Sequence, residues 1–352
     1  MPWPDVAIPP GETVAEILEA KGMTQAELAL RTGRPPQAIC EIVNGKKAIE
    51  PATATQFESV LGIPAYVWLN LERDYQYNKA RLEEKKRQEE EAYLVTKFQY
   101  AEISKLGWVK KTSDRLERVK ELRSFLGVAS LKLVPKASGA SYRISAAKEP
   151  SPQALAAWMR QGELQAGSIQ TAPYSATKLD AALSSLRALT RLTPREFEPQ
   201  LRQTCSDCGV ALVFVPQPPK TYAHGAARWL GPERALVQLS IRGRKEDIFW
   251  FSFFHEVAHL LLGMVKKREQ VIELDTGRHE CRADRFAAEI LLPPEQLQRL
   301  TRRGPLSEAR VRAFAEEIGV CPAVVVGRLQ HEKLLPRTHL NGLRRTLKWA
   351  DE

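Results

Sequence analysis

The sequence predicts a mostly helical α+β protein, with five helices in its first part and a small sheet packed against a helix in its last part. In the first 75 residues, segments with apolar residues at helical spacing are separated by Pro and Gly. Further on, the segments 210–215 and 236–241 are short, apolar and typical of strands. A strongly apolar helix that contains two histidines follows them.

We expect three segments along the chain. Residues 1–75 form the five-helix domain, residues 76–170 a charged spacer helix with helical connecting structure, and residues 171–352 the domain with the sheet. A chain of 352 residues is long enough for two or three domains, each with its own core. The connecting segment also holds a short predicted strand near 141–145.

A helix-turn-helix unit is indicated within the first domain. Gln25, Ala29, Gly33 and Ile39 occupy its positions 1, 5, 9 and 15. At these positions Ala permits close helix contact, Gly forms the turn and Ile packs the second helix. Thr24 can cap the first of the two helices, so the spacing predicts a DNA-binding domain.

The second helix of this unit, residues 35–44, is the expected recognition helix. Gln37 and Glu41 lie on its exposed face, where Gln37 can contact a base edge. The residues expected at phosphates are Gln25, Arg34, Lys46 and Lys47. For each of these polar residues the alternative is an ordinary solvated side chain. Because one such unit contacts one half-site, duplex DNA would be bound by a homodimer.

The first domain resembles the HigA-type antitoxin branch of the XRE family, whose fold is lambda-repressor-like. The resemblance depends on four stretches, which are Pro9 to Glu12, Met23 to Ala29, Asn44 to Ile49 and Trp68 to Glu72. It implies a compact domain that binds duplex DNA.

The apolar helix near residue 255 carries the spacing HExxH. His255 and His259 lie one turn apart, so both can direct a ring nitrogen to one Zn²⁺. Glu256 lies beside that position and is suited to take a proton from a water bound to the metal. The alternative is a pair of histidines that are hydrogen-bonded inside a buried helix.

A catalytic zinc site needs a third protein ligand, and we expect it in the helix that ends before Pro293. Glu280 and Asp284 share a face of that helix, so Glu280 can bind the metal while Asp284 orients a ligand histidine from a second shell. His279 is a rival ligand on another face. The acidic residues between the two helices are expected in a solvated loop, and these are Glu269, Glu273 and Asp275.

The chain from about residue 205 onward resembles the ImmA/IrrE metallopeptidases. The segment 209–216, the HExxH helix and the helix from 280 to 293 carry the resemblance. It implies a zincin-like fold and a cytoplasmic zinc peptidase of the gluzincin type that cleaves or regulates repressor proteins. Many relatives have a second acidic residue where this chain has Arg282, so the ligand role is assigned here to Glu280.

The segment between the two later strands is expected to be a loop that carries possible donors to the reacting carbonyl. His224 is the preferred candidate for this catalytic role, with Tyr222 and Arg228 beside it. The alternative is a plain loop histidine. An exposed strand of the sheet can hold an extended peptide by main-chain hydrogen bonds.

Two further patterns are interpreted as structural. Cys205 and Cys208 form a lone CxxC near a helix end, without the second pair that a zinc site of this kind needs. Ala315, Gly319 and Val325 repeat the spacing of a helix-turn-helix, but we favour a helical pair that closes the core of the last domain over a second DNA contact.

The composition is consistent with an intracellular protein that binds a polyanion. The formal net charge is +10, the isoelectric point is near 9.4, and the five cysteines do not suggest a disulfide framework. Apolar runs are too short for a membrane span, so we expect a cytoplasmic location.

Together these patterns predict a DNA-binding transcriptional regulator with a zinc-dependent endopeptidase domain. Its partners would be duplex DNA and a protein substrate of the repressor or antitoxin kind, and its cofactor Zn²⁺. The alternative is a non-catalytic antitoxin-like repressor whose peptidase fold is a sensor or toxin-binding surface.

Overall fold

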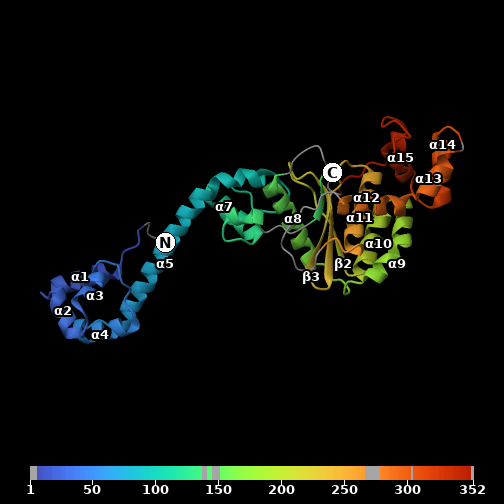
Figure 1. Ribbon diagram of the computed structural model, residues 1–352. Coiled ribbons are helices and arrows are strands. Elements are labelled where there is room, and N and C mark those ends of the chain that lie inside the picture. The colour runs from blue at the N-terminus through green and yellow to red at the C-terminus, as the bar shows by residue number, and fades with distance from the viewer. Residues whose placement is uncertain (1–5, 137–140, 145–150, 266–277, 303, 350–352) are drawn as a thin grey trace. The chain divides into compact units, whose positions relative to one another are not determined.

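The computed structural model of the protein describes residues 6–136, 141–144, 151–265, 278–302 and 304–349. The chain consists of two compact units, Met1–Ala92 and Tyr93–Glu352. The architecture is mostly helical with one small sheet, which confirms the predicted α+β class (Figure 1).

The first unit contains the five expected helices. They are α1 (Pro10–Ala20), α2 (Gln25–Thr32), α3 (Pro36–Val43), α4 (Pro51–Leu61) and α5 (Ala65–Glu91). Apolar residues from all five helices meet in one core, where Phe57 and Trp68 pack edge to face with ring centroids 5.5 Å apart. Both side chains are fully buried, so α4 and α5 are held together by aromatic packing.

Helices α2 and α3 have the geometry that the helix-turn-helix spacing predicts. Thr24 caps α2 by accepting a hydrogen bond from the backbone N–H of Glu27 at 3.1 Å. Gly33 ends α2 with a φ of 66°, in the left-handed region that glycine adopts without a steric penalty. Ala29 and Ile39 are buried, as positions 5 and 15 of this unit require.

Helix α5 is longer than the sequence suggested. The segment expected to begin a spacer at residue 76 continues α5 without a break to Glu91, and the first compact unit ends at Ala92. Beyond Trp68 the helix has many charged residues, and its two buried ones, Gln88 and Glu91, lie in the last turns. Its middle turns therefore depend on helix propensity and on contacts such as the hydrogen bond from Gln76 to Glu72 at 2.8 Å, more than on packing.

The second unit contains ten further α-helices and a sheet of four strands within the described residues. Its helices are α6 (Tyr100–Lys105), α7 (Arg115–Leu126), α8 (Pro152–Gly167), α9 (Ala176–Ala188), α10 (Pro194–Asp207), α11 (Glu246–Leu261), α12 (Arg278–Leu291), α13 (Pro294–Thr301), α14 (Glu308–Ile318) and α15 (Pro322–His331). Short 3-10 turns are η1 (Ala92–Phe98), η2 (Leu131–Lys136), η3 (Leu189–Arg191) and η4 (Asn341–Leu343).

The sheet has the strand order β1-β3-β4-β2. Its strands are β1 (Ser141–Ile144), β2 (Val210–Phe214), β3 (Ala223–Gly231) and β4 (Arg234–Leu239). β3 pairs antiparallel with β1 and β4, whereas β2 pairs parallel with β4. Helix α8 covers one face of the sheet, while α10 and α11 lie on the other (Figure 1).

Strand β3 corrects a sequence-based expectation. The segment around His224 and Arg228 was expected to be a loop, but it forms the longest strand of the sheet. Small residues such as Gly225 and Ala226 have a low preference for strands when taken alone. Pairing on both sides, to β1 and β4, supplies the stabilisation that local preference does not.

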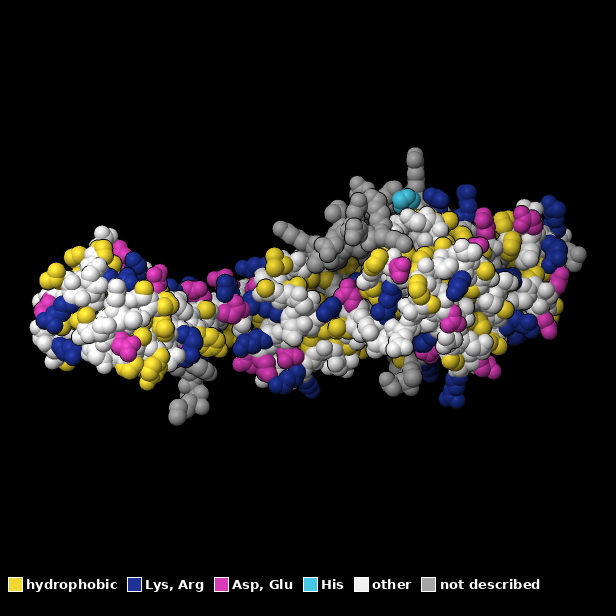
Figure 2. Space-filling model, turned by 90° about the horizontal axis from the view of Figure 1, so that it is seen from below, with side chains coloured by type: hydrophobic (Ala, Val, Ile, Leu, Met, Phe, Trp, Pro, Cys, Tyr) yellow, Lys and Arg dark blue, Asp and Glu magenta, His cyan; other side chains and the backbone are white. Residues whose placement is uncertain are grey.

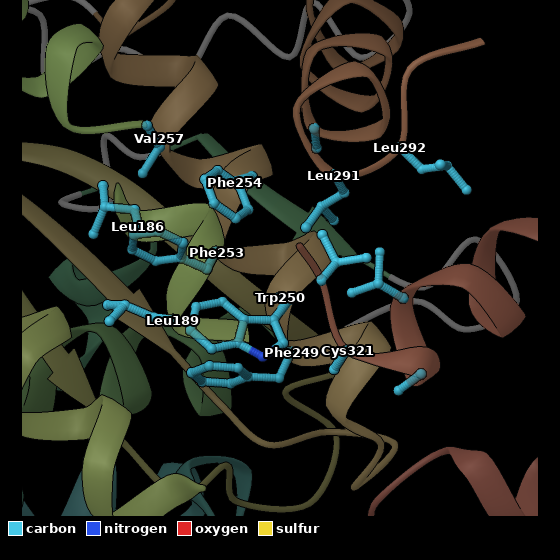
Figure 3. Close-up of a cluster of buried hydrophobic side chains, with 14 of the residues drawn as sticks. Leu186, Leu189, Phe249, Trp250, Phe253, Phe254, Val257, Leu291, Leu292 and Cys321 are labelled. Carbon is cyan, nitrogen blue, oxygen red and sulfur yellow. The ribbon is translucent and has the colours of Figure 1, made fainter. Parts of the chain in front are cut away.

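Helix α11 runs through the centre of the second unit, and nearly all of its side chains are buried. Phe249, Trp250, Phe253 and Phe254 form a continuous aromatic cluster, with neighbouring centroids 5.1–6.2 Å apart. Figure 3 shows this cluster among apolar side chains of other elements, Leu186, Leu189, Leu291, Leu292 and Cys321. A helix buried on all sides in this way is fixed in position and orientation.

The two patterns interpreted as structural both lie in this core. Cys205 and Cys208 are buried free thiols at the end of α10, and burial raises the pKa of each. Ala315 and Val325 are fully buried, and Gly319 ends α14 in the left-handed region. Helix α15 packs on α11, and α14 packs on α15, as expected for helices that close the core.

Among the described residues, none of the helices combines the length and the hydropathy that a membrane span requires.

Candidate functional sites

The two histidines of α11 are directed to one point. Both side chains are buried, with 0% of His255 and 1% of His259 exposed, and their Nε2 atoms lie 3.0 Å apart. The rings are nearly perpendicular, with centroids 4.7 Å apart. This convergence follows from the spacing of one helical turn and from the aromatic packing that fixes α11.

Helix α12 lies beside α11 and places Glu280 at the same point. Its Oε2 is 3.1 Å from Nε2 of His255, and its Oε1 is 3.3 Å from Nε2 of His259. Two atoms that bind one tetrahedral zinc, each about 2.1 Å from it, lie roughly 3.4 Å apart. His255, His259 and Glu280, here called the metal cluster, therefore fit a zinc ion with three protein ligands.

Hydrogen bonds within the metal cluster shift the pKa values of two of its residues, Glu280 and His255. Burial by itself raises the pKa of Glu280, but hydrogen bonds from His255 and His259 outweigh burial and lower this pKa to about 2. Burial likewise lowers the pKa of His255, while the hydrogen bonds to Asp284 and Glu280 raise it to about 9. A carboxylate is thus held ionised next to two buried rings, which is the donor set that zinc prefers.

Asp284 lies one turn after Glu280 and contacts the outer nitrogen of a ligand histidine. Its Oδ1 is 2.9 Å from Nδ1 of His255. With a metal bound at the metal cluster, Nδ1 would donate to this carboxylate and Nε2 would present its lone pair to the metal. The carboxyl group is half exposed, so it orients the ring from the solvent side.

Glu256 is fully buried and lies against strand β3. The close neighbour is Gly225, because a Cβ atom added there would lie 2.6 Å from both Cγ and Oε1 of Glu256. Any side chain at position 225 would therefore displace the glutamate. Gly225 is a site residue that the sequence alone did not reveal, since a lone glycine between alanines carries no local signal.

His224 lies next to Gly225 in β3 and is half-buried. The pairing of β3 with β1 is irregular between Ala223 and Ala226, so strand alternation does not assign the His224 side chain to a face. His224 is not among the three groups that converge in the metal cluster. Its role as a donor to the reacting carbonyl therefore stays a prediction.

The rival ligand His279 is not part of the metal cluster. His279 precedes Glu280 in the first turn of α12 and is half-buried, but it is not among the three groups that converge. The acidic residues of the expected loop lie outside the described residues, and these are Glu269, Glu273 and Asp275.

In the first unit the predicted DNA contacts are mostly at the surface of α2 and α3. Gln25, Gln37, Lys46 and Lys47 are exposed, and Glu41 is half-buried. Gln37 donates to Oε1 of Glu41 at 3.0 Å, so its amide is held at the surface of α3. The backbone N–H groups of Lys46 and Lys47 bond to the carbonyl of Glu41, which places both lysines directly after the recognition helix.

Arg34 differs from the other predicted phosphate contacts. Its side chain is half-buried, and Nε donates to Oε1 of Gln56 in α4 at 2.5 Å. This bond joins the turn between α2 and α3 to α4, so Arg34 has a structural contact in addition to any role at a phosphate. On the face that Figure 2 shows, Lys and Arg side chains are interspersed with Asp and Glu in both units.

Two protein families match this chain, one in each unit. The helix-turn-helix family matches residues 14–68, and the family of the IrrE N-terminal-like domain matches residues 238–330. The first match runs from within α1 to the start of α5, and the second spans the helices from α11 to α15 with the metal cluster. No curated protein matches the chain.

Two solved structures resemble about a quarter of the chain. One is described as an antidote protein of a plasmid maintenance system from Nostoc punctiforme, with 31% identity, 24% of this chain and 91% of that chain covered, and a TM-score of 0.23. The other is an addiction module antidote protein of the HigA family from Coxiella burnetii, with 31% identity, 24% and 94% covered, and a TM-score of 0.23.

Proposed function

We propose that this chain, which joins a helix-turn-helix domain of the XRE type to an IrrE/ImmA-like peptidase domain, is a DNA-binding regulator that hydrolyses a peptide bond in a repressor or antitoxin-like protein. One observation carries the enzymatic part. The ligand atoms of His255, His259 and Glu280 converge within 4.8 Å of one another, and Glu256 follows the first ligand on the same buried helix.

Each residue has a defined task in the proposed hydrolysis. When bound, zinc supplies Lewis-acid chemistry by polarising a carbonyl and lowering the pKa of a water to about 7. Glu256 takes the proton of that water and passes it to the leaving amine. Asp284 holds the ring of His255 in the required tautomer, and Gly225 leaves room for the carboxylate of Glu256 beside β3.

The presence of a helix-turn-helix domain favours the proposal that the substrate is itself a protein bound near DNA. A protease attached to a DNA-binding domain has a high effective concentration near a protein bound at the same promoter. We therefore infer that the target is another repressor, an antitoxin or the chain itself, and that a homodimer binds two half-sites of duplex DNA.

The decisive experiment compares cells that produce wild-type protein with cells that produce Glu256→Gln. Both proteins should contain zinc, because Glu256 is not a ligand, but only wild-type cells should contain new protein termini detected by mass spectrometry. Glu289→Gln, at an exposed glutamate of α12, is the matched control and should cleave like wild type. Identical termini in all three strains would reject the endopeptidase and favour the non-catalytic repressor.

A further inference from the structure

A cavity of about 140 Å³ lies between α11, α12 and α15, separate from the metal cluster. Phe251 forms part of its wall, and His255 follows one helical turn later, with the two ring centroids 6.4 Å apart. The cavity therefore borders both helices that carry the metal cluster without containing any of its three ligands.

The wall of this cavity is largely apolar. Its apolar residues come from all three helices and are Ile248, Phe251, Ala288, Leu291, Leu292 and Val324. A cavity of about 150 Å³ with such a lining is known to accept benzene. The space between the three helices is thus sufficient for a benzene-sized group, and too small for a larger ligand to be enclosed.

The acidic residue in the wall is already neutralised. Asp247 accepts two hydrogen bonds from Arg344, at 2.8 Å to Oδ1 and 2.7 Å to Oδ2. Gly327 allows α15 to approach this pair, since an added Cβ would lie 2.5 Å from Oδ2 of Asp247. Asp247 consequently does not select a cationic ligand.

The basic residue in the wall is Arg328, whose side chain is 20% exposed. Its Nη2 pairs with Glu332 at 2.9 Å, which engages one nitrogen of a group that has five N–H donors. A carboxylate is the strongest acceptor for a guanidinium group. His331, in the same last turn of α15, also lines the cavity.

We propose that this cavity binds a small organic acid, with a benzene-sized apolar body between the three helices and a carboxylate at Arg328. The site goes beyond the proposed hydrolysis, because it is formed by residues outside the metal cluster. Its occupant contacts α11 and α12 together, the two helices whose packing brings the metal ligands to one point.

The test uses the full chain loaded with zinc and two probes that share a benzyl group, phenylacetate and the uncharged benzyl alcohol, with binding measured by calorimetry. We expect phenylacetate to bind at least tenfold more tightly. Arg328→Gln should lower the affinity for phenylacetate to that for benzyl alcohol. It should leave the affinity for benzyl alcohol unchanged. Arg312→Gln is the control, because it removes an exposed arginine that is also paired with a glutamate four residues away. It should change the affinity for neither probe.

A second pair of variants tests whether the probes occupy the apolar part of the cavity. Ala288→Phe should fill the cavity and abolish binding of both probes, and the smaller change Ala288→Leu should weaken both if Ala288→Phe does not fold. Circular dichroism and zinc content establish folding. The proposal is overturned if phenylacetate does not bind, if both probes bind equally well, or if a folded Ala288→Phe protein binds as wild type does.

Discussion

The two helices on which function depends, α11 and α3, differ in how their polar residues are held. On α11 the polar residues of the motif are 0–1% exposed and lie inside an aromatic core. On α3 the apolar residues Ile39 and Ile42 are buried, while Gln37 is exposed. A buried polar group is unfavourable unless it is paired, so burial on α11 requires a partner such as a metal. Exposure on α3 imposes no such requirement.

The largest effect that would test this contrast is the loss of a metal ligand. His255→Ala or Glu280→Ala should lower zinc affinity by more than the roughly 10- to 100-fold typical of losing an outer partner such as Asp284. Competition with a chelator, read by metal analysis, measures the affinity. His279→Ala is the neighbouring control and should keep its zinc. If His279→Ala loses zinc while Glu280→Ala retains it, the third ligand is assigned to the wrong residue.

A smaller effect is expected from Glu246, the first residue of α11, on how the free energy of unfolding depends on pH. Glu246 is 2% exposed, and burial, with a contribution from Asp247, raises its pKa to about 7 against the opposing effect of Arg345. Between the ordinary carboxyl pKa and about 7, the folded state binds the proton and the unfolded state does not. The resulting stabilisation is therefore present at low pH and is lost as the pH rises through about 7.

Urea unfolding at pH 5 and pH 8 checks this prediction. The free energy of unfolding of wild type should fall between these values by an amount on the order of 1–3 kcal/mol that Glu246→Gln does not lose. Glu289→Gln should follow wild type, because this glutamate is exposed. If the free energy of unfolding changes equally between pH 5 and pH 8 in Glu246→Gln and wild type, Glu246 is ionised in the folded protein at both values.

The smallest effects are expected at the exposed surface of the first unit. Replacing Lys46 and Lys47 by Ala should weaken binding to all DNA sequences and reduce the slope of log affinity against log salt by about 2. Gln37→Ala should change sequence preference and leave the salt slope intact. Mobility-shift titrations at several salt concentrations with the full chain measure both quantities. A salt slope unchanged by the double lysine variant would remove these two residues from the interface.

Much of the fold could be predicted because its signals are local. Apolar spacing, Pro at helix starts and Gly33 after α2 indicated the five helices of the first unit, and the spacing of His255 and His259 placed two ligands on one face of a helix. Strand β3 was missed because its residues have weak strand preference and depend on partners that are distant in the sequence.

The sequence by itself determined which side chains could share a helix face, namely His255 with His259 and Glu280 with Asp284, because 3.6 residues per turn follow from the backbone alone. Only the tertiary structure decided that these two faces meet, with Glu280 3.1 Å from His255. The placement of Gly225 against Glu256 was likewise decided there. Contacts between elements depend on how aromatic and apolar side chains pack across the whole unit, and no local pattern contains that information.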